Sequence, residues 1–197
     1  LNLNGTGSYT LQDSLLIHYR FKINSGDFDS DGNYLRCEYL ETSMGSGDFA
    51  DFSNSTMLFT GYWNAMNFNS DGIFDFSGST VLVEGSRARI SCNLSDTLQL
   101  NEVIYIDGIE NEINANNRLK ISKLETNATH LFAYVARIDS LNINGGSILS
   151  FRQDSNTKIG HITQQTGCVD PIYIQGSENT TGYEINLLNN SVVSNAT

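Results

Sequence analysis

A twelve-residue acidic stretch has the residue types and the spacing of a calcium-binding loop. Residues 27–38 read DFDSDGNYLRCE, which fits the pattern D-x-D-x-D-G-x5-E. In such a loop the carboxylates at positions 1, 3 and 5 converge on one cation, and the glycine at position 6 permits a sharp turn. The sequence therefore predicts a calcium site, whose ligands would be Asp27, Asp29, Asp31, the carbonyl of Asn33, and Glu38.

The segments on either side of this loop alternate in the manner of strands, whereas an EF-hand would need helices there. Apolar and polar residues alternate from Ile17 to Ile23, and again from Tyr34 to Tyr39. A period of two residues predicts half-buried strands. The alternative interpretation is a plain turn that binds nothing, because Asp, Ser and Gly are the residues that turns favour.

Two short echoes in the sequence hint at an internal repeat. NFNSDG at 67–72 matches DFDSDG at 27–32, and SGDF occurs both at 25–28 and at 46–49. The second spacing is near 20 residues, but the echoes are too short to establish a solenoid.

Short strand-like segments follow one another along the chain, and no segment has the apolar stripe of an amphipathic helix. Turn signals such as Asp31-Gly32, Asp71-Gly72 and Asp107-Gly108 separate these segments. Many short strands at spacings of about 8–12 residues predict an all-β fold. We expect one domain over residues 1–197, an antiparallel β-sandwich or a jelly-roll-like fold, with a right-handed β-helix as the alternative.

The charge balance limits the classes of partner. The chain has 11 Lys plus Arg against 22 Asp plus Glu, and its net charge is −11. Without a cationic cluster, neither nucleic acid nor an anionic membrane surface is an expected partner. No apolar stretch approaches the ~18 residues of a membrane span, so we expect no membrane insertion. The chain does not begin with Met or a signal peptide, which indicates a mature or trimmed form.

Cysteines and glycosylation sequons fit an extracellular location, at a cell surface or a virion surface. Cys37 and Cys92 lie on apolar faces of predicted strands and are the first choice for a disulfide, with Cys168 left over. The alternative is three buried thiols. Asn93 lies on the polar face of its strand, so a glycan there would point to solvent. The pattern N-x-[ST] occurs at Asn4, Asn54, Asn93, Asn127, Asn179, Asn189 and Asn195.

The sequence holds no catalytic signature that we recognise. It lacks the motifs G-x-S-x-G, H-E-x-x-H, the P-loop and G-x-G-x-x-G. We therefore predict a protein that is not an enzyme, although a carboxylate pair acting on polysaccharide would not be visible in sequence. Tyr62 and Trp63 are candidate carbohydrate contacts, because the faces of aromatic rings stack on sugars. The alternative is that Trp63, the one tryptophan, packs in the core.

Together these patterns indicate a structural or adhesive extracellular protein, such as a subunit of a surface filament, fibre or shell. We expect it to self-associate by β-strand pairing and to be stabilised by calcium. Residues 1–11, where Leu1 and Leu3 alternate with asparagines, are the candidate strand that completes a neighbour's sheet. The alternative function is a carbohydrate- or receptor-binding, lectin-like domain of a virus, phage or secreted protein.

Overall fold

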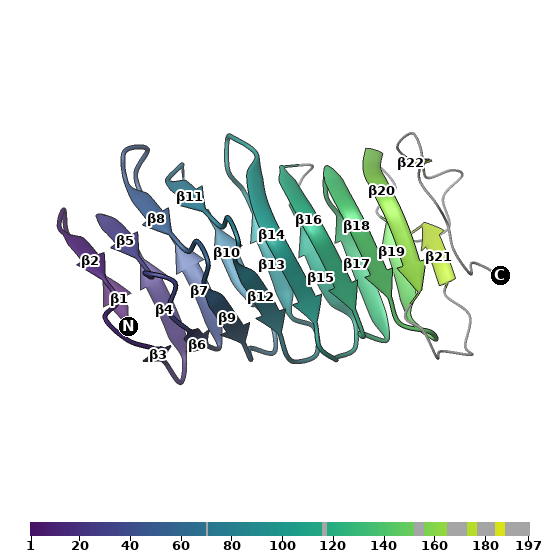
Figure 1. The fold of residues 1–197 in the computed structure, drawn as a ribbon, viewed down its shortest axis with the longest axis horizontal. Coiled ribbons are helices and arrows are strands. Elements are labelled where there is room, and N and C mark those ends of the chain that lie inside the picture. Colours follow the sequence, from purple (N-terminus) through teal and green to yellow (C-terminus); the bar gives the residue numbers. More distant parts are fainter. Residues whose placement is uncertain (70, 116–117, 152–155, 165–172, 177–183, 188–197) are drawn as a thin grey trace.

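The computed structural model describes residues 1–69, 71–115, 118–151, 156–164, 173–176 and 184–187. Within these residues the chain forms 22 β-strands and no helix, so no described helix could cross a bilayer. Every pair of neighbouring strands is parallel. The predicted antiparallel sandwich or jelly roll is therefore wrong. The protein is a parallel β-solenoid, as the β-helix alternative supposed, and forms an elongated rod (Figure 1).

Three sheets run along the rod. Sheet A contains β1 (Asn2–Leu3), β4 (Arg20–Ile23), β7 (Tyr39–Thr42), β10 (Met66–Phe68), β13 (Arg89–Cys92), β15 (Asn111–Asn114), β17 (His130–Tyr134), β19 (Ile148–Phe151) and β21 (Tyr173–Gly176). Sheet B contains β2 (Ser8–Thr10), β5 (Asp27–Asp29), β8 (Phe49–Asp51) and β11 (Ile73–Asp75). Sheet C contains β3 (Leu15–Leu16), β6 (Leu35–Cys37), β9 (Thr56–Phe59), β12 (Thr80–Val83), β14 (Leu98–Tyr105), β16 (Leu119–Thr126), β18 (Arg137–Ile143), β20 (Asn156–Gln164) and β22 (Glu184–Leu187).

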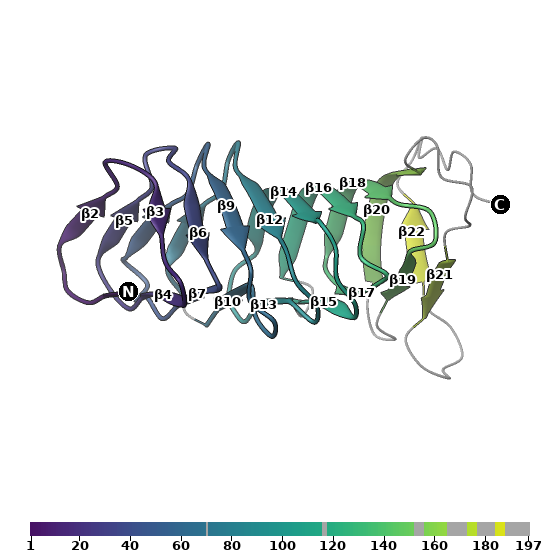
Figure 2. The ribbon, with the colours of Figure 1, turned by 90° about the horizontal axis from the view of Figure 1, so that it is seen from below.

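The cross-section of the rod changes along its length. Sheet B ends at β11, so the N-terminal coils have three sides and the later described coils alternate between sheets A and C alone. Figure 2 shows the three-sided coils at the end where the chain begins. The number of residues in a coil also varies, since Lys22 stacks on Glu41 and Glu41 on Asn67, at separations of 19 and 26 residues.

The core is a set of columns formed by inward-facing side chains of successive coils. On β17 the buried residues alternate with half-buried ones, as a strand with one face on the core requires. One column on sheet B and its corner consists of Phe28, Phe52 and Phe76, whose neighbouring ring centroids lie 5.3 and 4.9 Å apart. A second column crosses sheet C and consists of Leu35, Met57, Val81, Val103, Leu124, Leu141 and Ile162, all buried.

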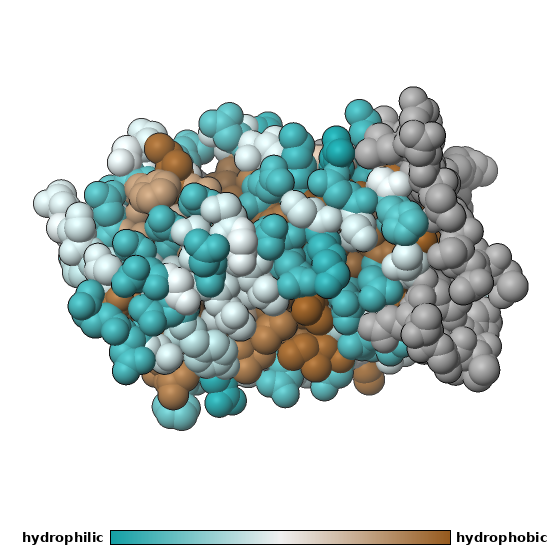
Figure 3. Space-filling model, viewed as in Figure 1, coloured by the Kyte–Doolittle hydropathy of each residue, from teal (hydrophilic) through white to brown (hydrophobic). Residues whose placement is uncertain are grey.

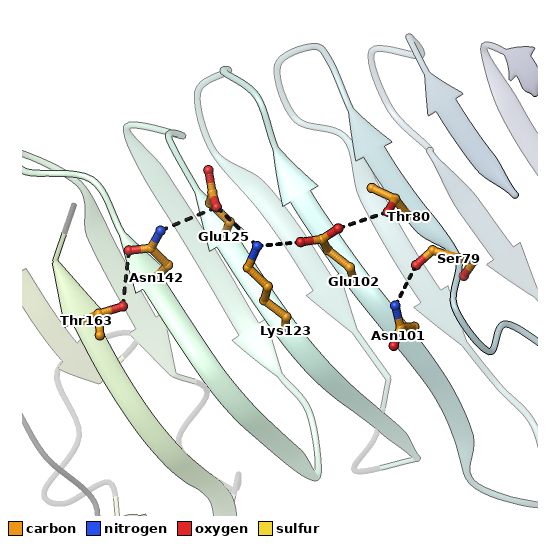
Figure 4. A network of polar contacts seen from close by, with 8 residues as sticks. All are labelled: Ser79, Thr80, Asn101, Glu102, Lys123, Glu125, Asn142 and Thr163. Carbon is orange, nitrogen blue, oxygen red and sulfur yellow. Dashed lines mark hydrogen bonds and ion pairs between the residues drawn. The ribbon is translucent and has the colours of Figure 1, made fainter. Parts of the chain in front are cut away.

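Polar side chains form a network across the outer face of sheet C (Figure 4). Glu102 on β14 accepts a hydrogen bond from Thr80 at 2.9 Å and pairs with Lys123 at 2.5 Å. Lys123 also lies 3.9 Å from Glu125, which accepts a hydrogen bond from Asn142 at 3.4 Å. These contacts join β12, β14, β16 and β18, and so hold consecutive coils together.

We expect Glu102→Gln to make folding less sensitive to acid. The hydrogen bond from Lys123 holds the pKa of Glu102 below its ordinary value, helped by Thr80 and opposed by partial burial. A carboxylate with a lowered pKa in the folded state stabilises the fold at neutral pH, and this contribution is lost as pH falls through that pKa. Thermal melts at about pH 7 and about pH 3 should show a smaller loss of Tm in Glu102→Gln than in the parent.

Glu84 provides the matched control for that measurement, because it is an exposed glutamate at the end of the neighbouring strand β12. Glu84→Gln removes the same charge and should lose as much Tm on acidification as the parent. Equal losses in Glu102→Gln and in the parent would contradict the role given to the network.

Candidate functional site

The structure distributes the predicted calcium ligands over a strand and two corners. Asp27 and Asp29 lie on β5 of sheet B, Asp31 and Asn33 lie in the corner that follows, and Glu38 lies beyond the far end of β6. The N–H of Asp31 donates to the carboxylate of Asp29 at 2.7 Å, so those two residues come together. Glu38 does not join them, because an extended strand rises about 3.3 Å per residue and all of β6 intervenes.

The donor set as folded does not fit a calcium shell. Among the described residues, no group of three or more His, Cys, Asp and Glu side chains is arranged to hold a metal ion. Calcium takes about six to eight oxygens, and this corner gathers far fewer. Calcium binding stays a prediction from spacing alone. Titration calorimetry tests this prediction. A binding heat that is seen in the parent and lost in Asp31→Asn would support the site, whereas no binding heat in the parent at millimolar calcium would contradict it.

The acidic stretch has a structural role that the sequence analysis missed. Asp29, Asp51 and Asp75 occupy the same place in three consecutive coils, as the last residue of their sheet B strands. Each accepts a hydrogen bond from the backbone N–H two residues later, at 2.7, 2.7 and 2.8 Å. These carboxylates therefore close the corner between sheets B and C. The signal in the sequence was the repeat DFSNST at 51–56 and DFSGST at 75–80.

The predicted disulfide between Cys37 and Cys92 is not formed, and both residues are free, buried thiols. Cys92 lies on β13 of sheet A, two strands beyond β7, the strand that follows Cys37. Two layers of parallel strands span about 10 Å, whereas a disulfide needs Cα atoms within about 7 Å. Burial raises the pKa of Cys37 to about 12 and also raises that of Cys92, so both are poor nucleophiles. Cys168 lies outside the described residues.

The sequons differ in accessibility. Asn4, Asn54 and Asn93 are exposed, as the pattern around Asn93 predicted. Asn127 is half-buried, and its side-chain oxygen is buried without a hydrogen-bond partner in the described part of the chain. Glycan occupancy stays a prediction at all of these sites. The remaining sequons lie outside the described residues: Asn179, Asn189 and Asn195.

Among the described residues, the N-terminal coil carries the terminal strand edges at one end of the rod. Its strands β1, β2 and β3 are the terminal strands of sheets A, B and C in the described part of the molecule. Residues 1–11 therefore pair within the chain, through β1 with β4 and β2 with β5. The N–H groups of Leu11, Leu15 and Ile17 donate to the following coil. Because successive N–H groups of a strand point to opposite sides, the alternate ones face outward.

The interior of this first coil is also only partly covered. Its inward-facing apolar side chains pack on the core but are not fully buried, since no further coil of the described residues lies beyond them. They are Leu3, Tyr9, Leu11, Leu15 and Ile17. We call these side chains, with the outer edges of β1, β2 and β3, the open end.

Tyr62 and Trp63 project from the corner at 60–65, which joins β9 of sheet C to β10 of sheet A. Their exposed fractions are 52% and 63%, so Trp63 is not a core residue. The two rings meet edge to face, with centroids 5.1 Å apart. Gly61 seats this corner on the preceding coil, because its N–H donates to the carbonyl of Glu38 at 2.9 Å. A Cβ at Gly61 would lie 2.5 Å from that oxygen.

The next two corners hold this aromatic pair in place. The guanidinium of Arg87 lies over both rings, 6.0 Å from the centroid of Tyr62 and 5.7 Å from that of Trp63. Arg87 also pairs with Glu110 at 2.9 Å. Both charged residues have a backbone φ of 58°, a left-handed conformation that is uncommon for residues other than glycine.

Comparison with models of known families found no match, and comparisons with curated proteins and with solved structures found none either. The class of the protein, a parallel β-solenoid, therefore rests on its strand pairing. Its function has to be inferred from the open end and from the exposed corner residues.

Proposed function

We propose that this protein is a non-enzymatic, extracellular structural or adhesive module that self-associates through its open end. The observation that carries the proposal is the all-parallel stacking of coils, in which β1, β2 and β3 are the terminal strands of the three sheets in the described part of the chain. Unpaired edges are templates for further strands, and solenoids that remain single need terminal coils with a polar outer face. The first described coil presents half-buried apolar side chains, and a second copy that pairs there would bury them.

Pairing of this kind would continue the construction of the rod itself. Main-chain hydrogen bonds to the neighbour would supply affinity, and the inward-facing side chains of the two copies would supply register. A head-to-tail contact generates a growing filament or fibre, whereas a contact between two open ends stops at a dimer. The side chains on the outer faces of sheets B and C support a structural role, because several of them bond to the neighbouring coil.

Two neighbouring lysine variants test the open end. Leu11 faces the interior of the first coil, whereas Thr10 is exposed on the outer face of β2. Leu11→Lys would place an unpaired ammonium in the contact, which should weaken association at least roughly tenfold. Thr10→Lys adds the same charge one residue away and should leave association within about threefold of the parent.

Sedimentation velocity over a range of concentrations measures this association, and negative-stain micrographs distinguish a dimer from a filament. We expect the parent to form concentration-dependent oligomers. A parent that stays monomeric at the highest attainable concentration would contradict the proposal, and so would equal effects of the two lysine variants.

A further inference from the structure

We propose that the corners joining sheet C to sheet A bind a neutral, linear oligosaccharide. These corners lie along the lower edge of the rod in Figure 1. In the same orientation, Figure 3 shows both hydrophilic and hydrophobic side chains along this edge, with a hydrophobic group below the middle of the rod. The binding surface, which we call the aromatic strip, consists of Tyr19, Tyr39, Tyr62 and Trp63 with Arg20 and Arg87.

The strip is built from two clusters with the same parts. Tyr62 and Trp63 have Arg87 over their rings, and that arginine is paired with Glu110. The first cluster, on the preceding coils, repeats this construction. Its members are Tyr19 edge to face with Tyr39 at 6.1 Å, Arg20 at 5.8 Å from the ring of Tyr39, and Glu41 paired with Arg20 at 3.1 Å.

The two clusters lie on neighbouring layers of the rod. Gly61, which precedes Tyr62, bonds to the carbonyl of Glu38, which precedes Tyr39. Adjacent layers of strands are about 4.8 Å apart, so the rings of the two clusters follow one another along the rod. A linear ligand can therefore contact both clusters if it lies parallel to the axis.

A change in corner length leaves the second cluster uncovered on one side. One residue, Glu38, joins β6 to β7, whereas residues 60–65 join β9 to β10 in the next coil. The longer corner extends past the shorter one, and this accounts for the high exposure of Tyr62 and Trp63. Arg87 covers only part of the ring of Trp63, since 63% of that residue is still exposed.

The chemistry of the strip suits sugars without charge. Exposed aromatic faces accept the apolar faces of pyranose rings, and fixed polar groups beside them select for hydroxyls. The guanidinium groups and tyrosine hydroxyls donate hydrogen bonds, while Glu41 and Glu110 accept them. Each arginine already has a glutamate partner, so the second cluster carries no spare positive charge, whereas in the first cluster Glu41 also pairs with Lys22 at 2.9 Å. The chain's net charge of −11 further disfavours anionic glycans.

The second cluster is also held by two residues whose backbone conformations are energetically unfavourable. Arg87 and Glu110 keep left-handed conformations, which cost on the order of 1 kcal/mol or more each. Such conformations gather where a side chain must be aimed, and here they aim the ion pair that supports Trp63. A rigid platform loses little conformational entropy when it binds a ligand.

Trp63 reports on its own site, because it is the one tryptophan of the chain. The full chain would first be screened against an array of neutral and anionic oligosaccharides. The hexasaccharide with the strongest signal would then be titrated while tryptophan emission and acrylamide quenching are recorded. We expect a saturable shift of the emission to shorter wavelength and protection from quenching.

Variants separate this strip from other surfaces. Tyr39→Ala leaves the reporter in place and should weaken binding about tenfold, and Trp63→Ala should weaken array binding at least as much. Tyr173→Ala is the control, since Tyr173 is 54% exposed on β21, far along the rod. Circular dichroism of each variant verifies that the fold is kept.

The outcome does not depend on self-association. Leu11→Lys, which blocks the open end, should bind the sugar as the parent does, so failure of one proposal leaves the other intact. The inference is overturned if no neutral glycan changes the emission of Trp63. A protein would then be the remaining candidate partner for the strip. The inference is overturned also if binding survives in both Tyr39→Ala and Trp63→Ala, or if only anionic glycans bind.

Discussion

Phe52→Ala should lower the free energy of unfolding by about 3–5 kcal/mol, the usual cost of removing a buried aromatic ring. Phe52 is fully buried and lies in the middle of a column, between Phe28 and Phe76. Its ring stacks on that of Phe76, with centroids 4.9 Å apart and an interplanar angle of 14°. Removal therefore opens a cavity between two coils at once. Urea unfolding of parent and variant measures the difference.

Phe49 is the matched control, because it is the same residue type and begins β8, the strand that ends directly before Phe52. Phe49 is 36% exposed, so Phe49→Ala leaves no closed cavity and should cost less than about 1 kcal/mol. If Phe49→Ala destabilised the protein as much as Phe52→Ala, the assignment of inward and outward faces on sheet B would be wrong.

Gly108→Ala should destabilise the protein by at least about 2 kcal/mol. Gly108 has a φ of 109°, which side-chain-bearing residues rarely adopt. A Cβ there would lie 2.3 Å from the carbonyl oxygen of Gly85, in the preceding corner, and 2.7 Å from the amide nitrogen of Asn111. That amide is buried and donates to the carbonyl of Asp107, so its displacement would leave a polar group unsatisfied.

Gly47→Ala is the corresponding control for glycine replacement. A Cβ at Gly47 would meet no heavy atom within 4 Å, and its backbone φ is not in the left-handed range. The expected change in unfolding free energy is below about 1 kcal/mol. Equal costs at Gly47 and Gly108 would contradict the close stacking of the sheet C to sheet A corners.

Strand formation was predictable from the sequence, because alternation is a local property of the chain. The segments Arg89–Cys92 and Leu35–Cys37 are strands, and their inward faces are those that the pattern indicated. Alternation does not mark corners, however. The segment from Ile17 to Ile23 was predicted as one strand, but only Arg20–Ile23 is a strand, and residues 17–19 form the corner before it. Apolar and polar residue types continue to alternate through that corner, although His18 and Tyr19 are both exposed.

Parallel pairing was not predictable by the same means, because alternation is equally compatible with an antiparallel sandwich. The coils also vary in length, so the repeat has no constant period. The two copies of the SGDF motif are offset by one residue in the register of β5 and β8. Phe28 pairs with Ala50 and is buried, whereas Phe49 is exposed and its N–H donates to the carboxylate of Asp27 at 3.1 Å.

The other repeated motif, DFDSDG at 27–32 and NFNSDG at 67–72, does not mark equivalent positions in the fold either. Asn67 belongs to β10 of sheet A, whereas Asp27 belongs to β5 of sheet B, so similar letters occupy different sides of the solenoid. The informative repeat was DFSNST and DFSGST, which preserves the carboxylate and the buried phenylalanine of each corner.

The candidate sites could be recognised only in part from the sequence. Tyr62 and Trp63 were identified as neighbours in the chain, but their exposure depends on the length of the preceding corner. Arg87 and Tyr39 come from other coils, more than 20 residues away, and no local pattern connects them. The open end likewise depends on which strands lie at the edges of the three sheets.

The stacking of parallel coils, on which both proposals depend, is tested most directly by engineered disulfides. Arg89 and Glu112 are register partners on neighbouring strands, face solvent and pair at 2.6 Å. Neighbouring strands lie about 4.8 Å apart, within the Cα range of a disulfide. Asn114 lies two residues further along β15 on the same face, at a diagonal distance of about 7–8 Å from Arg89.

Peptide-mapping mass spectrometry of two oxidised double variants therefore decides the register. The variant Arg89→Cys with Glu112→Cys should form the bridge between positions 89 and 112 nearly completely. The variant Arg89→Cys with Asn114→Cys should form little bridge. Absence of the first bridge in folded protein, or a stronger bridge in the second variant, would contradict the parallel solenoid.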